Sequence, residues 1–220
     1  MKKNKKKKRL RKFVVFLLFI ALLAGILYLV SKVPIKNIYV SGNNILTDQE
    51  VIDTSNIANY PSFLLTTRHS IKKKLKNNDY IKDVSVSKWL FKVTINIKEY
   101  EPLFILSSNN KILLENNKEI ENNKNITLPI FNDTDEINEN FIKGYIKITK
   151  SVKEKISEII YNPTEFDKDR YLLYMNDGNK VYITVTKIEY LNKYDKIVTK
   201  FEGKKGTLYL DSGNYFEINK

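Results

Sequence analysis

The stretch IKNIYVSGNNILTDQEV, residues 35–51, is the part of the sequence that decides the fold. Its first residues alternate between apolar and polar types, which predicts a strand with the apolar members Ile35, Ile38 and Val40. The segment SGNN then has the composition of a turn. Thr47 begins a capping box, T-D-Q-E, in which Glu50 can bond back to the cap residue. A strand, a turn and a helix that begins at Asp48 are therefore predicted.

The residues after this stretch predict a second helix and a hairpin. In RHSIKKKLKNN, residues 68–78, Ile71 and Leu75 are four positions apart and form the buried face of a short helix. Alternating runs on both sides of SKWLFK, residues 87–92, predict two antiparallel strands. Their apolar positions are Ile81, Val84 and Val86, then Val93, Ile95 and Ile97. Residues 33–101 are thus expected to form one domain with the order strand, helix, helix, strand, strand.

The residues before this domain predict a membrane anchor. Residues 13–30 contain no charged residue, and a helix of that length spans about 27 Å, close to the hydrocarbon core of a bilayer. Lys12 and Lys32 flank the run, and Tyr28 lies where interfacial aromatic residues occur. A removed signal peptide would have a shorter apolar region and a small-residue cleavage site, which YLVSKVP lacks. We therefore predict an uncleaved transmembrane helix over residues 13–31.

Charge predicts the orientation of this anchor and excludes one class of partner. The chain has 38 basic and 25 acidic residues, a net charge of +13. Nine of the basic residues lie in residues 2–12, and removing them leaves 29 basic against 25 acidic residues. Basic residues beside an anchor stay in the cytoplasm, so residues 1–12 are expected to form a cytoplasmic tail and the later domains to lie outside the cytoplasm. No nucleic acid is expected as a partner there, and the absence of cysteine fits an exported chain without disulfides.

Residues 102–220 are expected to form a β-rich second domain, whose first half holds short strands. PLFILSSNNKILLENNKEI, residues 102–120, predicts a hairpin that turns at Asn109-Asn110. LPIF, residues 128–131, is a short strand or a buried contact. Most of residues 115–140 is polar, rich in asparagine and acidic, and is expected to be a surface loop.

The second half of this domain is expected to add amphipathic helices. Apolar residues at helical spacing predict one long helix over residues 138–160. Asp177-Gly178 suits the tight turn of a hairpin between two alternating strands. A further helix is expected over residues 188–198, and the chain closes with a strand pair, or with one strand and a tail, over residues 206–218. The predicted fold class is α+β.

No catalytic, metal or cofactor site is predicted. His69 is the only histidine and the chain has no cysteine, so a zinc site lacks ligands. Ser70 and Lys73 match the S-x-x-K pattern of penicillin-binding enzymes, whose partner motifs are missing. Asp133 and Asp135 begin like a calcium loop, but asparagine stands where that loop needs glycine. A binding protein, and not an enzyme, is therefore predicted.

The last strand is a candidate binding edge. An open edge of a β-sheet can add a strand from a partner, whose backbone supplies the hydrogen bonds. TLYLDSGNYFEI, residues 207–218, is β-prone and lies near the end of the chain. The same pattern also fits an interior strand of the second domain, and both interpretations stay open.

Three segments of the first domain resemble a POTRA domain, which has a V-x-G-N turn, two helices and a V-x-V hairpin that ends with Glu and Pro. They are IKNIYVSGNNILTDQEV at 35–51, IKKKLKNNDYIKDVSVSK at 71–88 and FKVTINIKEYEP at 91–102. With the basic tail, the single anchor and the β-rich second domain, the whole chain resembles the FtsQ/DivIB family of bacterial cell-division proteins. In the second domain the resemblance rests on EYEPLFIL at 99–106, LPIF at 128–131 and KGTLYLDSGNYFEI at 205–218.

This resemblance implies a non-enzymatic scaffold of the divisome, held in the cell membrane at the division septum. It implies binding of FtsL-like and DivIC/FtsB-like single-pass proteins, with septal wall synthases as further partners, and recruitment or regulation of septal cell-wall synthesis. It places the partner surface on the final helix and strand, at Tyr209, Leu210, Tyr215 and Phe216. The alternative is a POTRA-type docking or chaperone module for protein transport at the membrane, although such modules usually occur in tandem before a β-barrel.

Overall fold

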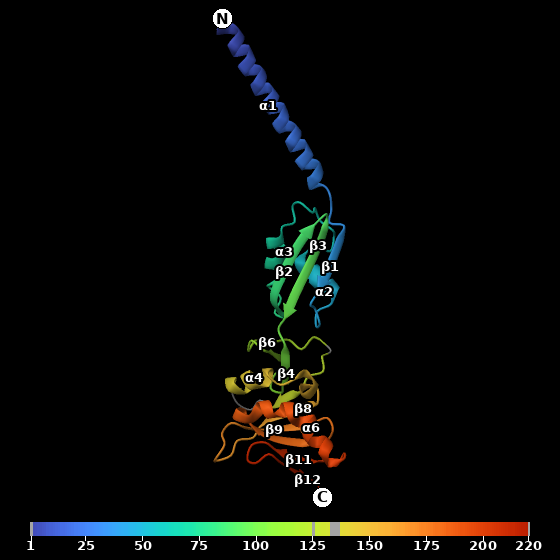
Figure 1. The fold of residues 1–220 in the computed structure, drawn as a ribbon, viewed down its shortest axis with the longest axis vertical. Helices are drawn as coiled ribbons and strands as arrows, with labels where there is room; N and C mark the ends of the chain where they lie inside the picture. The colour runs from blue at the N-terminus through green and yellow to red at the C-terminus, as the bar shows by residue number, and fades with distance from the viewer. Residues whose placement is uncertain (1, 125, 133–136, 220) are drawn as a thin grey trace. The chain divides into compact units, whose positions relative to one another are not determined.

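The computed structural model describes residues 2–124, 126–132 and 137–219 (Figure 1). The chain forms two compact units, Met1–Glu99 and Tyr100–Lys220, and each is described by itself. Helices and strands are mixed along both units, which confirms the α+β fold class.

The first unit begins with a long helix, α1 (Lys2–Ser31). Its part Arg11–Ser31 is 21 residues long and apolar enough to cross a membrane, and none of it is buried against the rest of the chain. The helix starts well before the predicted span of 13–31. Lysine, arginine and leucine are good helix formers, and no proline or glycine interrupts residues 2–12, so helix continues through the basic segment.

The rest of the first unit is a three-stranded sheet with two short helices. Its elements are β1 (Asn37–Ser41), α2 (Asp48–Ser55), α3 (Arg68–Leu75), β2 (Ile81–Trp89) and β3 (Lys92–Glu99). The strand order is β1-β3-β2, with β1 parallel and β2 antiparallel to β3. This confirms the predicted order of strand, helix, helix, strand, strand.

Local sequence explains both helices of this domain. Thr47 caps α2 by accepting the backbone N–H of Glu50, whose carboxylate accepts the backbone N–H of Thr47, so the predicted capping box is present. In α3, Ile71 and Leu75 are both buried, as their spacing predicts. The helices thereby cover the sheet with the faces that the sequence marks as apolar.

The turn after β1 explains the glycine and the glutamate of the POTRA pattern. Gly42 has φ +81°, and a Cβ there would lie 2.1 Å from the carbonyl oxygen of Ile97, so only glycine fits. The carboxylate of Glu99, at the end of β3, accepts three successive backbone N–H groups at 2.8–2.9 Å, those of Asn44, Ile45 and Leu46. The end of the last strand therefore holds the turn that precedes α2.

The second unit is built on a nine-stranded sheet. The strands are β4 (Pro102–Leu106), β5 (Ile112–Leu114), β6 (Glu119–Ile120), β7 (Ile130–Asn132), β8 (Ile156–Tyr161), β9 (Arg170–Met175), β10 (Lys180–Thr184), β11 (Gly206–Tyr209) and β12 (Tyr215–Ile218). Their order in the sheet is β12-β11-β10-β9-β8-β7-β4-β5-β6. The helices are α4 (Glu139–Ile146), α5 (Lys150–Lys153), the 3-10 helices η1 (Val185–Lys193) and η2 (Thr199–Phe201), and α6 (Tyr194–Val198).

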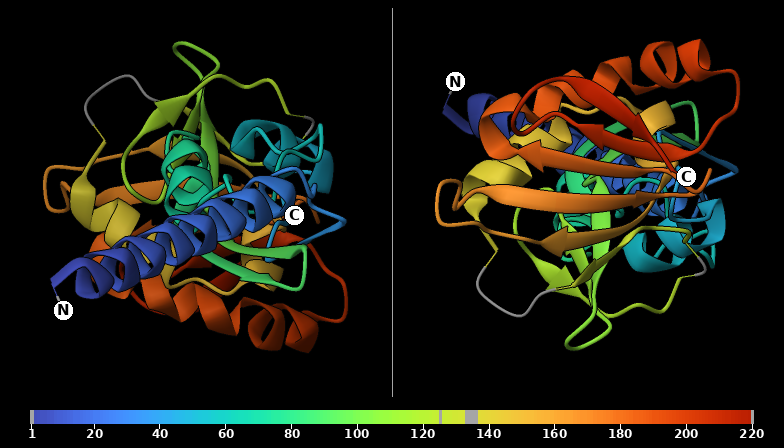
Figure 2. Two further views of the ribbon diagram at one scale, coloured as in Figure 1. Left: turned by 90° about the horizontal axis from the view of Figure 1, so that it is seen from above. Right: turned by 90° about the horizontal axis from the view of Figure 1, so that it is seen from below.

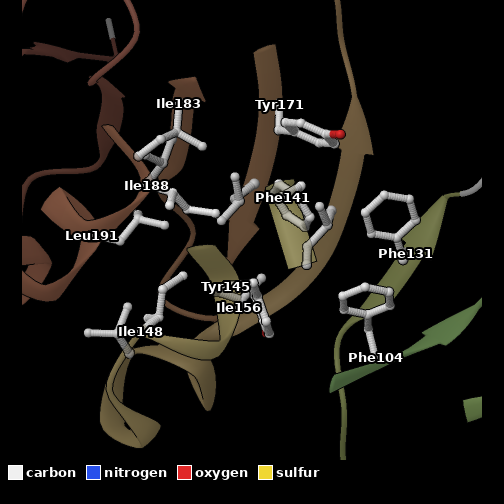
Figure 3. Close-up of a cluster of buried hydrophobic side chains, with 14 of the residues drawn as sticks. Phe104, Phe131, Phe141, Tyr145, Ile148, Ile156, Tyr171, Ile183, Ile188 and Leu191 are labelled. Atoms are coloured by element: carbon white, nitrogen blue, oxygen red, sulfur yellow. The ribbon is translucent and has the colours of Figure 1, made fainter. Parts of the chain in front are cut away.

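An aromatic cluster lies within the hydrophobic core of this β domain, among aliphatic side chains such as Ile156 and Ile183 (Figure 3). The rings of Phe141 and Tyr171 stack with centroids 4.0 Å apart, and those of Phe104 and Phe131 stack at 4.8 Å. Tyr145 closes the cluster edge-on against Phe104 at 5.6 Å. The cluster joins β4, β7, β9 and α4, so it connects the two halves of the domain.

In the right-hand view of Figure 2, β9 and β10 lie in front with no helix between them and the viewer.

The predicted long helix over residues 138–160 is wrong. The chain forms α4 and α5 and then strand β8, which pairs with β7 and β9. A register shift between Ile156 and Glu158 marks a β-bulge, and Ile156 and Ile159 are both buried. The extra residue of a bulge lets two residues three positions apart share one face of a strand, which imitates the period of a helix.

Most other elements of this domain follow the predictions. The hairpin over 102–120 is present as β4 and β5, with Asn110 in a left-handed conformation at the turn. Gly178 has φ +87° between β9 and β10, as the predicted tight turn requires. The chain closes with a strand pair, β11 and β12, which is one of the two predicted alternatives. LPIF at 128–131 contributes to a short strand, β7, which is one of its two predicted alternatives, and within the expected loop of 115–140 the structure adds the short strand β6.

Candidate partner-binding surface

The four residues predicted to bind partners lie on both faces of the β11–β12 pair. Tyr209 pairs with Tyr215, so their side chains share one face. Phe216 pairs with Leu208 and lies on the other face, where its ring stacks on Phe201 at 4.3 Å. Leu210 is 1% exposed and belongs to the hydrophobic core. The structure therefore leaves Tyr215 exposed and Tyr209 and Phe216 half-buried on opposite faces, and Leu210 is not on the surface.

The strand that carries Tyr215 is the last one of its sheet. β12 pairs with β11 on one side, and no strand of the described residues pairs with its other side. Its backbone groups on that side are available to an added strand. Both interpretations that the sequence leaves open for residues 207–218 apply in part: β11 is an interior strand between β10 and β12, and β12 is the edge strand.

A row of three tyrosines, here called the tyrosine ladder, crosses the strands next to this edge. The rings of Tyr182 on β10 and Tyr209 on β11 stack with centroids 5.3 Å apart, and Tyr215 on β12 stacks on Tyr209 at 4.6 Å. The guanidinium of Arg170 on β9 covers the free face of Tyr182 at 3.8 Å from the ring centroid. The ladder is thus a preorganised aromatic strip with a cation at its inner end.

An ion pair fixes the arginine at that inner end. Arg170 Nε donates to the carboxylate of Asp211 at 2.6 Å, and Lys187 donates to the carbonyl oxygen of Asp211 at 2.9 Å. Burial alone would raise the pKa of Asp211, but hydrogen bonds from Arg170 and from Ser212 outweigh it and hold this pKa below its usual value. The carboxylate is therefore charged at neutral pH and orients the guanidinium over the ladder.

The hydroxyl of Tyr209 is also held in place. It donates to the carboxylate of Glu217 at 3.2 Å. Its pKa is raised, first by burial and then by that hydrogen bond, so the phenol stays neutral at physiological pH. A neutral phenol with an apolar ring suits protein contacts, in which tyrosine is an enriched residue type.

Asn179 anchors the strand pair to the rest of the domain. Its buried side-chain oxygen accepts the backbone N–H of Gly206, at the start of β11, at 2.9 Å. Its amide donates to the hydroxyl of Tyr194 at 2.9 Å, and that hydroxyl donates to the carboxylate of Asp177. Burial, the largest cause, raises the pKa of Tyr194. This network connects the β9–β10 turn, α6 and β11, and thereby positions the outer strands.

Two members of the surface were missed in the sequence. Arg170 and Tyr182 belong to strands that the sequence predicts as a hairpin, whose turn is at Gly178. In the observed register Tyr182 pairs with Leu172 and Thr184 with Arg170, so both missed residues point to the same face. The predicted hairpin was the only feature of the sequence from which this shared face could have been inferred. Their approach to Tyr209 was not visible, because β10 pairs with β11 in parallel across the whole of η1 and α6.

Among the described residues, those considered for catalysis or metal binding are not assembled into a site. The described part of the chain contains no group of three or more His, Asp or Glu residues that could hold a metal ion. His69 and Ser70 lie at the start of α3, near the surface of the first domain. Asp133 and Asp135 lie outside the described residues.

These observations define a class of protein: a candidate membrane anchor, a POTRA fold and a β domain that ends in an open edge. A family model for the FtsQ-type POTRA domain matches residues 33–100, and a model for the C-terminal part of cell division protein FtsQ/DivIB matches residues 103–211. The chain belongs to the FtsQ/DivIB family of cell-division proteins. This is not an enzyme family, and membership of it supports a role in the division machinery.

Two curated relatives agree with this assignment. The chain is 34% identical to cell division protein DivIB of Listeria monocytogenes, over 99% of this chain and 85% of that protein. It is 29% identical to DivIB of Bacillus subtilis, over 99% of this chain and 87% of that protein. A solved structure of the major extracytoplasmic domain of DivIB from Geobacillus stearothermophilus, in its trans isomer, matches 48% of this chain and 96% of that chain, with 23% identity and a TM-score of 0.39.

Proposed function

We propose that this protein is a non-enzymatic scaffold of the divisome. Helix α1 anchors it in the cell membrane with the N-terminus in the cytoplasm, and both domains lie outside the cytoplasm. Its β domain binds FtsL-like and DivIC/FtsB-like single-pass proteins and so helps to recruit or regulate septal wall synthesis. The single observation that carries the proposal is the edge strand β12 beside the tyrosine ladder.

The chemistry of that edge suits a protein partner. A strand of the partner that adds to β12 gains backbone hydrogen bonds, and its side chains on one face meet Tyr215 and Tyr209. Stacked tyrosines lose little conformational entropy on binding, because each ring is already held by its neighbour. Aromatic residues and arginine also dominate binding energy in protein interfaces.

The position of the protein in living cells tests the proposed role. A fluorescent protein is fused to the cytoplasmic N-terminus, and growing cells are imaged through the division cycle. The expected result is a band at midcell that follows constriction. An even distribution in the membrane throughout the cycle would contradict the divisome role and would favour the docking module for protein transport.

Substitutions at the edge test the partner surface. The double change Tyr209→Ala and Tyr215→Ala should weaken binding of FtsL-like and DivIC/FtsB-like proteins by about tenfold or more, as expected when interface aromatics are truncated. Phe166→Ala is the matched control, since Phe166 is fully exposed in the same domain but outside the ladder. Equal binding by both variants would exclude this surface.

A further inference from the structure

Exposed apolar side chains gather at one end of the POTRA domain. Four residues, here called the apolar tip, come from the β2–β3 turn and from the loop before α3: Trp89, Leu90, Leu64 and Leu65. Their exposed fractions are 74%, 65%, 46% and 71%, respectively. Large apolar side chains that cluster on a surface indicate a contact with something apolar.

Contacts between its two loops hold the apolar tip in place, although it is exposed. Leu90 and Phe91 both have a left-handed backbone, φ +44° and +63°, which is unfavourable for residues with side chains and marks stored strain. The ring of Phe91 packs edge-on against Phe63 at 5.3 Å and so joins the two loops. Lys88 donates to the carbonyl oxygens of Phe63 and Thr66 and lies over the Phe63 ring. Trp89 and the leucines are therefore exposed on two loops that the Phe63–Phe91 contact and the hydrogen bonds of Lys88 hold together.

The chain connects the apolar tip directly to the end of the membrane helix. The backbone N–H of Phe63 donates to the carbonyl oxygen of Val33 at 2.9 Å, and that of Lys36 donates to Phe91 at 2.8 Å. Helix α1 ends at Ser31, and two residues of chain reach at most about 7 Å. The headgroup layer on each side of a bilayer is roughly 5–7 Å thick. With Ser31 at the edge of the hydrocarbon core, the loop that carries Leu64 and Leu65 would lie at the depth of the lipid headgroups.

The charge around the apolar tip suits an anionic lipid surface. Segments 32–47, 54–78 and 84–98, which include the tip and the chain that leads to and from it, contain no aspartate or glutamate. Arg68 contacts the carbonyl oxygen of Lys88, and Lys36 lies 5.6 Å from the centre of the Phe91 ring. Tryptophan flanked by basic residues is the composition that favours the interface between lipid headgroups and acyl chains.

We propose that the apolar tip inserts into the interfacial layer of the bilayer that holds α1, so that the POTRA domain is attached to the membrane at a second point. The proposal depends on α1 as the membrane anchor, and it is independent of the partners bound by the β domain. It assigns Trp89 and the two leucines of the loop to lipid contact.

The tryptophan itself provides the test, because Trp89 is the only tryptophan of the chain. The full-length protein is reconstituted in vesicles of phosphatidylcholine and phosphatidylglycerol, with or without bromine on the acyl chains. The expected result is a blue-shifted Trp89 emission that loses intensity in the brominated vesicles. The control is Trp89→Phe with Phe166→Trp, which places tryptophan at a fully exposed site of the β domain and should show neither effect.

A second variant separates insertion from simple proximity. Leu64→Ser with Leu65→Ser keeps Trp89 and changes only exposed side chains, so the fold should persist, and bromine quenching of Trp89 should fall. If the emission of Trp89 in the unaltered protein is not blue-shifted and is not quenched by brominated lipid, the proposal is overturned. A blue-shifted but unquenched Trp89 would also overturn it, because a protein surface would then cover the tip. Neither result would affect the midcell test of the divisome role.

Discussion

At the scale of single residues, Glu99 shows why the POTRA pattern ends with an acid. Its carboxylate accepts three backbone N–H groups of the turn before α2. Glu99→Gln replaces one acceptor oxygen with a donor that faces N–H groups, and should destabilise the POTRA domain by about 1–3 kcal/mol. Urea unfolding followed by Trp89 fluorescence measures this change.

A matched control separates the hydrogen bonds from the loss of charge. Asp83→Asn removes the same charge from an exposed position of β2 in the same domain. It should leave the urea midpoint nearly unchanged. Equal midpoints for the two variants would show that Glu99 does not hold the turn.

Asp211 gives the β domain a pH-dependent contribution to stability. Despite the opposing effect of burial, hydrogen bonds from Arg170 and Ser212 hold its pKa below the usual value. The contribution is therefore fully present above the unfolded pKa of about 4, and it is lost as the pH falls through the lower folded value. The difference in Tm between the wild type and Asp211→Asn should be large at neutral pH and shrink below about pH 4.

Thermal unfolding between pH 7 and pH 2 measures this difference. Glu165→Gln, at an exposed position of the same domain, is the control and should have almost no effect on Tm at any of these pH values. A Tm difference for Asp211→Asn that stays constant down to pH 2 would contradict the assigned role of the ion pair.

At the scale of elements, β12 depends on a glycine in its neighbour. A Cβ at Gly206 would lie 2.0 Å from the carbonyl oxygen of Glu217 and 2.7 Å from the ring of Phe216. Gly206→Ala should therefore displace β12 while β9 and β10 stay paired. Hydrogen exchange measured by mass spectrometry should show faster exchange at residues 215–218, whereas Thr207→Ala, at the next position, should not cause it.

Elements whose pattern is local could be predicted from the sequence. The capping box at Thr47 depends on residues three positions apart, and the hairpin turn at Gly178 depends on adjacent ones, so both were identified. Strand β8 was mistaken for helix because its bulge gives buried residues at a spacing of three. Two tyrosines of the ladder, Tyr209 and Tyr215, were named from the sequence, whereas Tyr182 was missed because it joins them through a parallel pairing between β10 and β11. Leu210 is two positions after Leu208 and shares its buried face, so the alternation did indicate burial; the family resemblance, and not this pattern, placed Leu210 on the partner surface.

At the scale of the whole molecule, the proposed topology has a direct test. The chain has no cysteine, so single cysteines can be introduced without background. Lys3→Cys should react with a membrane-impermeant maleimide only after protoplasts are permeabilised, because basic residues stay in the cytoplasm. Phe166→Cys should react in intact protoplasts. The reverse pattern would contradict the topology.

The pairing of β1 with β3 has a mechanical consequence. The two strands are parallel neighbours, paired from Asn37–Lys92 to Ser41–Asn96. The chain enters β1 from the anchor helix and leaves the domain at the end of β3, so tension along the chain pulls the two strands past each other lengthwise. Their backbone hydrogen bonds are then loaded together and not opened one at a time, which makes forced unfolding slow. We expect the POTRA domain to act as a tension-bearing link that carries force from the β domain to the membrane without unravelling.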